Sequence, residues 1–339
     1  MRKYLLLFLF IICSYTVNSV QAAISVDAAS AILMEKVTKR VLYEKNMNTR
    51  YLTASIAKIM TAIVAIENGN LDEYYQVDEE TTRQTGSSVY LQLGEEIKLQ
   101  DLIYGLLLRS GNDAAYLIAN SVGKDYDDFI FLMNETAKKI GMKNSSFSNP
   151  SGLDEKSANY SSAYDMALLM AYALGNEEFQ KITQTKTYRG HTKSGAILYY
   201  VNKHRLVQTK DYVTGGKTGY TTNAKRTLVT SANKNNMELI VVTFNCGDDW
   251  NVHQKLFEYG YNNYQMYLVI KSQIIKVNDY LYPATPMIVH DIKYPVRHDE
   301  KVEFVIQLLK HPLTNKIIGK VKIYIDGKGV YSVDIYRYY

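Results

Sequence analysis

The chain has 339 residues, of which 47% are hydrophobic and 22% are charged, and its formal net charge is +5. This composition predicts an ordinary globular protein, long enough for one large and one small domain. The sequence has no long basic runs and no clusters of basic and aromatic residues, which argues against nucleic-acid binding.

The first 22 residues carry the pattern of a signal peptide. Arg2 and Lys3 precede an apolar run at 5–12 that is too short to span a bilayer, and Ala22 is a small residue at the cleavage position. We therefore expect removal of residues 1–22 and export of the mature chain to the extracytoplasmic cell envelope. Cys246 is then the remaining cysteine, so an intramolecular disulfide is excluded.

Helices dominate the middle of the chain, and strands flank them. Two strand-like runs come first, and a helix is predicted from Ser55 to Asn68 because its apolar residues repeat with helical spacing. Further helices are predicted at 101–122, 126–140, 162–174 and 253–261, and strands at 31–34, 40–43, 197–201, 226–231 and 237–244.

The composition changes after residue 262. Short β-branched runs follow at 267–270, 302–306, 321–325 and 330–335, with a turn at Asp326-Gly327 between the last two. We predict a domain at 23–262 and a small all-β domain at 265–339. The final residues, 331–339, alternate with period two, which favours a strand over an amphipathic anchor helix. Peripheral association with the envelope stays open.

Three short motifs carry chemistry. They are Ser55-Ile56-Ala57-Lys58, Ser110-Gly111-Asn112 and Lys217-Thr218-Gly219. The Ser-x-x-Lys pattern occurs three times, but only at Ser55 does it open an apolar helix, which places serine and lysine one turn apart on one face. No histidine is placed to act as the base. The pattern therefore predicts acyl transfer through a serine ester, with a lysine moving the proton.

Other polar residues favour ordinary structural roles. The six histidines, at 191, 204, 253, 290, 298 and 311, are scattered without metal-ligand spacing. We therefore predict no metal site and no cofactor. The 30 tyrosines are spread across the predicted helices and strands, as expected of half-buried packing residues.

The motif set resembles the penicillin-binding protein and serine β-lactamase superfamily. More closely, the chain is similar to the low-molecular-weight D-alanyl-D-alanine carboxypeptidases over roughly 24–262, including the segments 86–113, 147–154 and 216–221. The resemblance implies an α/β (α+β) catalytic domain of the β-lactamase and transpeptidase type, with an antiparallel sheet flanked by helices. A small C-terminal all-β domain is expected to follow.

The resemblance also implies roles for the motif residues at the reacting bond. Ser55 corresponds to the nucleophile and Lys58 to the base that takes its proton. Ser110 would relay a proton to the leaving amine, and Asn112 would hold an amide carbonyl of the substrate. Lys58 must be neutral part of the time, so burial and a nearby Lys217 should lower its pKa.

The resemblance also implies that the third motif binds the substrate. Lys217 and Thr218 would bind the terminal carboxylate, and the strand that continues through Gly219 and Tyr220 would pair with the extended peptide. The backbone amides of Ser55 and Tyr220 would form an oxyanion hole. Family members often carry an arginine before the last helix, but here residues 247–251 contain none. Arg226 is the alternative cation if the fold brings it close.

The resemblance implies that the substrates are peptidoglycan stem peptides ending in D-Ala-D-Ala, with β-lactam antibiotics as covalent inhibitors. A peptidoglycan D,D-endopeptidase would use the same residues. A serine β-lactamase is disfavoured because no Glu-x-x-Leu-Asn string occurs. A non-catalytic envelope protein that only binds stem peptides is a further alternative, disfavoured by the intact Ser55, Lys58 and Lys217.

Overall fold

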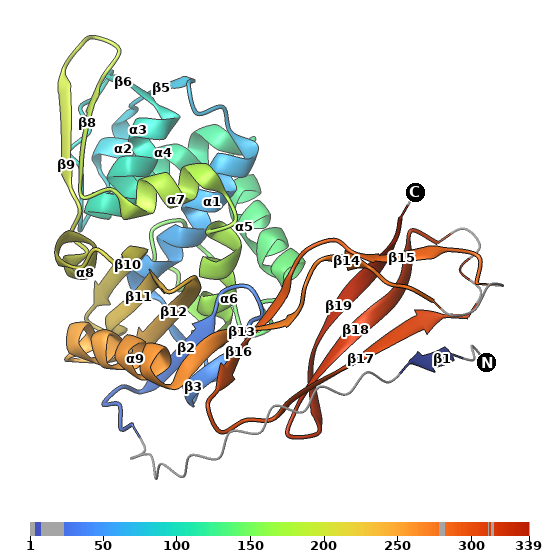
Figure 1. Cartoon of the computed structure of the whole chain (residues 1–339). Helices are drawn as coiled ribbons and strands as arrows, with labels where there is room; N and C mark the ends of the chain where they lie inside the picture. The colour runs from blue at the N-terminus through green and yellow to red at the C-terminus, as the bar shows by residue number, and fades with distance from the viewer. Residues whose placement is uncertain (1–3, 8–23, 278–281, 311, 313–314, 339) are drawn as a thin grey trace. The chain divides into compact units, whose positions relative to one another are not determined.

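The computed structural model describes residues 4–7, 24–277, 282–310, 312 and 315–338 (Figure 1). These residues form two compact units. One unit comprises Ile24–Gly260, and the other comprises the described residues from Tyr261 onward with strand β1 (Tyr4–Leu7). Apart from β1, the predicted signal peptide lies outside the described residues, so cleavage and export stay predictions.

A five-stranded antiparallel sheet forms the centre of the first unit, with the strand order β10-β11-β12-β2-β3. The bounds are β2 (Ser30–Glu35), β3 (Val41–Lys45), β10 (Val213–Thr221), β11 (Lys225–Lys234) and β12 (Met237–Phe244). Asn235 and Asn236 both adopt positive φ, which suits a tight turn between β11 and β12. Strand β10 lies at the sheet edge, so no strand among the described residues pairs with one side of its backbone.

Helices cover both faces of this sheet (Figure 1). Ile32 and Met34 of β2 join the core cluster that contains the buried helices α1 (Lys58–Asn68) and α6 (Ala163–Ala173). Leu33 points to the opposite face because successive strand side chains alternate. There it meets Gly260 of α9 (Asp249–Asn263). The antiparallel sheet flanked by helices confirms the predicted fold class.

The unit contains further helices and three pairs of short strands. The helices are α2 (Glu79–Thr82), α4 (Asn112–Val122), α5 (Tyr126–Ile140), α7 (Glu177–Gln184) and α8 (Arg205–Thr209). Among these, α4, α5 and α7 pack against α1. The paired strands are β4 (Tyr51–Leu52) with β7 (Tyr160–Ser161), β5 (Tyr74–Gln76) with β6 (Glu96–Lys98), and β8 (Thr187–His191) with β9 (Ile197–Val201).

The predicted continuous helix at 101–122 is wrong. The chain forms α3 (Leu99–Tyr104) and then a π-helical segment, η2 (Gly105–Arg109). Ser110 takes the left-handed conformation with φ 66°, which ends the helix before α4 begins. The apolar spacing continues across the break, so periodicity alone could not reveal it. The last helix also begins earlier than predicted, at Asp249.

The second unit is all β, as predicted. Its larger sheet has the order β1-β17-β18-β19-β15-β14. Its strands after β1 are β14 (Gln273–Ile274), β15 (Thr285–Ile288), β17 (Val302–Leu309), β18 (Ile317–Ile325) and β19 (Lys328–Tyr338), while β13 (Tyr264–Ile270) pairs with β16 (Ile292–Arg297). Asp326 and Gly327 form the predicted turn, both with positive φ. Among the described residues, no helix has the length and apolar character needed to cross a bilayer.

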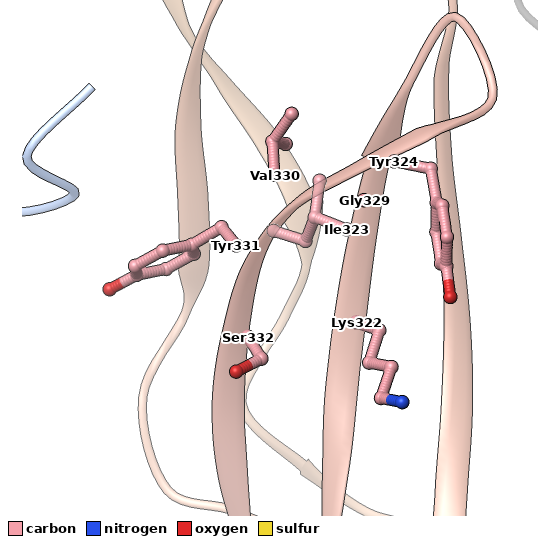
Figure 2. Close-up of a pocket in the computed structure, with 7 residues that line it drawn as sticks. All are labelled: Lys322, Ile323, Tyr324, Gly329, Val330, Tyr331 and Ser332. Carbon is pink, nitrogen blue, oxygen red and sulfur yellow. The ribbon is translucent and has the colours of Figure 1, made fainter. Parts of the chain in front are cut away.

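An open pocket of about 530 Å³ lies on the β18–β19 hairpin of this unit. Figure 2 shows the residues that line it. Tyr324 and Tyr331 both line it, but their rings extend away from one another. The two rings therefore do not present their faces to one ligand. None of the predicted catalytic residues lines this pocket, because all of them lie in the first unit.

Candidate active site

The candidate nucleophile lies in a tight turn at the start of α1. Ser55 belongs to the 3₁₀ helix η1 (Ala54–Ala57), and Lys58 is the first residue of α1. Residues three apart are eclipsed in a 3₁₀ turn, so these two side chains lie side by side. The distance from Lys58 Nζ to Ser55 Oγ is 3.1 Å.

The backbone before Ser55 is held in an unfavourable conformation. Ala54 has φ 46°, a left-handed value that L-residues with a Cβ rarely adopt. Gly152 packs directly on it, since a Cβ on Gly152 would lie 1.9 Å from the Ala54 carbonyl oxygen. On the other side, a Cβ on Gly219 of β10 would lie 2.9 Å from the Ser55 nitrogen. Two glycines therefore let neighbouring backbones fix the position of the serine.

Lys58 is fully buried and surrounded by oxygen atoms. Besides Ser55, its amine contacts Asn112 Oδ1 at 2.7 Å and the backbone carbonyl of Ser151. Burial lowers the pKa of Lys58 well below its usual value, and repulsion from Lys217 lowers it further. This is the combination that the sequence predicted for a lysine acting as a base.

The second motif lies against Lys58 at the start of α4. The Asn112 side-chain amide donates to the Thr85 carbonyl at 2.6 Å, and its backbone N–H donates to the Ser87 carbonyl at 2.7 Å. These contacts orient the Asn112 side-chain oxygen toward Lys58. Ser110 is buried beside them, but among the described residues no hydrogen bond joins its hydroxyl to Ser55 or Lys58.

The third motif runs along edge strand β10. Lys217 is buried, and its amine donates to the Thr218 carbonyl at 2.8 Å. Burial lowers the pKa of Lys217 to about 7, with a further contribution from Lys203. Thr218 and Gly219 are half-buried, and Tyr220 is 64% exposed. The strand therefore presents both a cation and an open backbone edge.

Arg226 lies close to the third motif. It stands opposite Tyr220 in the β10–β11 register. Its guanidinium forms two hydrogen bonds with the buried carboxylate of Asp249, at 3.1 and 2.7 Å, and lies over the Trp250 ring. The segment that lacks the expected arginine thus supplies the acid and the aromatic ring that hold this one.

Three groups at the site were not assigned by sequence reasoning. The Ser151 carbonyl accepts from Lys58, and the segment 147–154 was noted only as resembling the family. Lys203 lowers the pKa of both motif lysines, after burial. Asp113 is buried and accepts hydrogen bonds from the Val89 and Leu91 amides. Asp113 directly follows the Ser110-Gly111-Asn112 motif, and this position in the sequence was the signal that could have indicated its role in holding the loop.

The first unit therefore contains a serine hydroxyl beside a buried amine, with a second buried amine on an adjacent edge strand. Within the part of the chain that the structure describes, no group of three or more histidine, cysteine or acidic side chains is arranged to hold a metal ion. The fold and the site together define an acyl-transfer enzyme of the serine type.

Comparison with known proteins identifies the family. The profile of the D-alanyl-D-alanine carboxypeptidase family, peptidase S11, matches residues 16–247. The chain belongs to this family of serine peptidases.

Individual relatives agree with this assignment. D-alanyl-D-alanine carboxypeptidase DacF of Bacillus subtilis is 35% identical over 253 residues, a match that covers 72% of this chain and 65% of DacF. A D-alanyl-D-alanine carboxypeptidase structure from Mycobacterium tuberculosis has a TM-score of 0.68 at 27% identity, covering 73% of this chain and 96% of that one.

A third similar protein extends the likeness of fold to the β-rich unit. DacD of Francisella tularensis has a TM-score of 0.74 at 24% identity, with 96% of each chain covered. The comparisons confirm the predicted family, the serine-peptidase class and the fold. The matched segment spans just under two thirds of the length of DacF.

Proposed function

We propose that this chain is a serine-type D-Ala-D-Ala carboxypeptidase that removes the terminal D-alanine from peptidoglycan stem peptides. Its membership of the D-alanyl-D-alanine carboxypeptidase family supports this substrate class. The observation that carries the mechanism is the 3.1 Å contact between the Ser55 hydroxyl and the buried amine of Lys58.

The surroundings of Lys58 suit a neutral amine. A neutral amine has two N–H donors and one lone pair. The Asn112 side-chain oxygen and the Ser151 carbonyl are acceptors only, so each requires a donor. With both N–H groups used in this way, the lone pair of Lys58 is left for the Ser55 hydroxyl. Lys58 then takes the proton as Ser55 attacks.

The reaction has two steps. Ser55 Oγ attacks the carbonyl of the penultimate D-alanine, and its proton passes to Lys58. The amides of Ser55 and Tyr220 stabilise the oxyanion that forms. The peptide C–N bond then breaks, and the leaving amine takes a proton that reaches it through Ser110. Water, deprotonated by the same lysine, hydrolyses the Ser55 ester and releases the shortened peptide.

The substrate's terminal carboxylate binds at the third motif. Lys217 and Thr218 provide a charged and a hydroxyl donor there, while Arg226 provides the guanidinium donors that Asp249 leaves unused. Asn112 holds an amide carbonyl on the acyl side. The open edge of β10 pairs with the extended peptide, as an added strand would.

β-Lactams, which resemble the D-Ala-D-Ala end, acylate Ser55 and leave slowly. The proposal also includes export through the predicted signal peptide and peripheral association with the envelope.

A D,D-endopeptidase needs the same catalytic groups, so the products decide between the two activities. Mass spectrometry of treated muropeptides gives loss of one alanine in the first case and cleavage of a cross-bridge in the second.

Labelling with a fluorescent penicillin, together with release of D-alanine from diacetyl-Lys-D-Ala-D-Ala, tests the assignment of Ser55. Wild type should show both signals, and Ser55→Ala should show neither. Ser121→Ala is the matched control, because Ser121 begins a second Ser-x-x-Lys pattern in α4 that lacks this site. Equal labelling of wild type and Ser55→Ala would refute the proposal.

A further inference from the structure

A small hollow adjoins the loop that holds Asn112. Its volume is about 320 Å³. The lining residues come from three segments, namely Ser88, Val89 and Tyr90, then Arg109, and Tyr199, Tyr200 and Val201 of β9. The loop accepts hydrogen bonds from Asn112 at Thr85 and Ser87, directly before the three lining residues that it supplies. The hollow therefore borders the side of the site that Asn112 occupies.

Two exposed tyrosines line this hollow. Tyr90 is 79% exposed and Tyr199 is 63% exposed. Tyr90 also has φ 63°, an unfavourable backbone conformation for a bulky residue. The buried carboxylate of Asp113 fixes this loop by accepting from the Val89 and Leu91 amides on either side. Buried hydrogen bonds thus hold an aromatic ring in solvent in a strained conformation, which favours a binding role.

The charge at the hollow is positive. Arg109 is the charged residue in its lining, and its guanidinium donates to the Val201 carbonyl at 3.2 Å, which leaves further donors unused. Arg109 forms no ion pair with any residue that the structure describes. Lys203 lies nearby, and its pKa is lowered by partial desolvation of its amine and by repulsion from Arg109. The nearby carboxylate of Asp113 is occupied by hydrogen bonds from Ser88, Val89 and Leu91. The unused donors of Arg109 therefore favour a bound anion.

We propose that this hollow binds the acyl-side part of the substrate, with Arg109 recognising a side-chain carboxylate on the residue before D-Ala-D-Ala and Tyr90 and Tyr199 packing on its aliphatic chain. The inference rests on the proposed function, in which Asn112 lies on the acyl side and Lys217 on the leaving-group side. Arg109 is then a specificity-determining residue, because it contacts a part of the peptide that does not react.

Two peptides that differ by one carboxylate test this subsite. One is diacetyl-L-Lys-D-Ala-D-Ala, and in the other a diacetylated meso-diaminopimelyl residue replaces lysine. A charge-assisted hydrogen bond should give wild type about a tenfold higher kcat/KM on the diaminopimelyl peptide. Arg109→Gln should reduce that ratio to near one, while Arg109→Lys retains part of it. Lys234→Gln, which removes one exposed positive charge at the end of β11, should keep the full ratio.

Equal kcat/KM values for the two peptides in wild type, or an unchanged ratio in Arg109→Gln, would overturn the subsite while leaving the carboxypeptidase intact. Release of D-alanine from neither peptide would instead contradict the proposed function. In that case calorimetric titration of both peptides into the Ser55→Ala protein decides the subsite. Tighter binding of the diaminopimelyl peptide supports it, and equal binding rejects it.

Discussion

The two units differ in what they bury. The unit at 24–260 encloses charged groups, among them Lys58, Lys217, Asp113 and Asp249. The described residues beyond Gly260 that are buried are apolar or aromatic, apart from prolines and a glycine. Burying an ionisable group costs free energy unless partners compensate, and for both lysines part of that cost is visible as a lowered pKa. Among the described residues, buried charged side chains lie in the first unit, which also holds the candidate catalytic residues.

Lys58→Met is expected to have the largest effect on activity. It removes the base but fills much of the same space with an uncharged side chain. Release of D-alanine should fall by about a thousandfold, as expected for loss of a general base. The free energy of unfolding should not fall, because a buried amine is replaced by an apolar group.

Kinetics on diacetyl-Lys-D-Ala-D-Ala and urea unfolding measure the two effects of Lys58→Met. Lys143→Met, at a solvent-facing position after α5, controls for loss of a lysine in general. A Lys58→Met protein with more than a tenth of wild-type activity would contradict the assignment of Lys58 as the base.

The pH dependence distinguishes the two buried lysines. As the pH rises, more Lys58 is neutral and able to act as base, while Lys217, with a pKa of about 7, loses the charge that binds the carboxylate. We therefore expect kcat/KM of wild type to decline on the alkaline side. In Lys217→Arg the guanidinium stays charged, so the ratio of kcat/KM at pH 9 to that at pH 7 should rise by up to about fiftyfold, the change in the charged fraction of Lys217 between these pH values.

A pH profile of kcat/KM from pH 5 to 10 measures this change. Arg226 carries a charge at all these values, so Arg226→Lys should leave the shape of the profile unaltered and only lower its height. An alkaline limb that is identical in wild type and Lys217→Arg would show that Lys217 does not set it.

Much of the fold followed from the sequence because it depends on local patterns. Apolar and β-branched runs identified β12 and β17, and the Asp326-Gly327 turn between β18 and β19 followed from its residue types. The break at Ser110 did not follow, because serine has no strong preference for the left-handed conformation that it takes here. Helical spacing of the apolar residues on both sides therefore hid the break.

The chemistry of the site was predictable in its residue types but not in its partners. Ser55, Lys58 and Lys217 are close enough to influence one another, as the motifs suggested. The Ser151 carbonyl escaped prediction because backbone atoms carry no sequence signal. The pairing of Arg226 with Asp249 depends on the register of β10 and β11 and on the start of α9, neither of which one sequence reveals.

Asp113→Asn tests whether buried charge also positions groups that do not react. The carboxylate holds the loop at 85–91 through the amides of Val89 and Leu91, and that loop orients Asn112. Losing the charge weakens these bonds, so the free energy of unfolding should fall by about 1–3 kcal/mol. We expect kcat/KM to fall by about fivefold, mainly through kcat, because Asn112 becomes less well oriented.

The matched control for Asp113→Asn is Asp165→Asn. Asp165 is also buried, in the first turn of α6, and accepts hydrogen bonds from the Asn144 amide and the Ser145 hydroxyl away from the site. It should lose similar stability with kcat/KM unchanged. Equal losses of activity in both variants would mean that stability alone, and not loop position, explains the effect.

The smallest effect on activity is expected from the core of the second unit. Ile323 is fully buried in β18, and Ile323→Ala should lower the free energy of unfolding by about 2–5 kcal/mol through lost contacts and a cavity. Its kcat/KM should stay within about twofold of wild type at a temperature where the protein is folded. The proposed catalytic residues all lie in the first unit, and substitutions at distant sites usually act independently. Ile63→Ala removes the same atoms from α1, which carries Lys58, and should lower both stability and kcat/KM. A folded Ile323→Ala protein with strongly reduced kcat/KM would show that the β-rich unit contributes to catalysis, and the division between a unit that buries charge for chemistry and one that does not would fail.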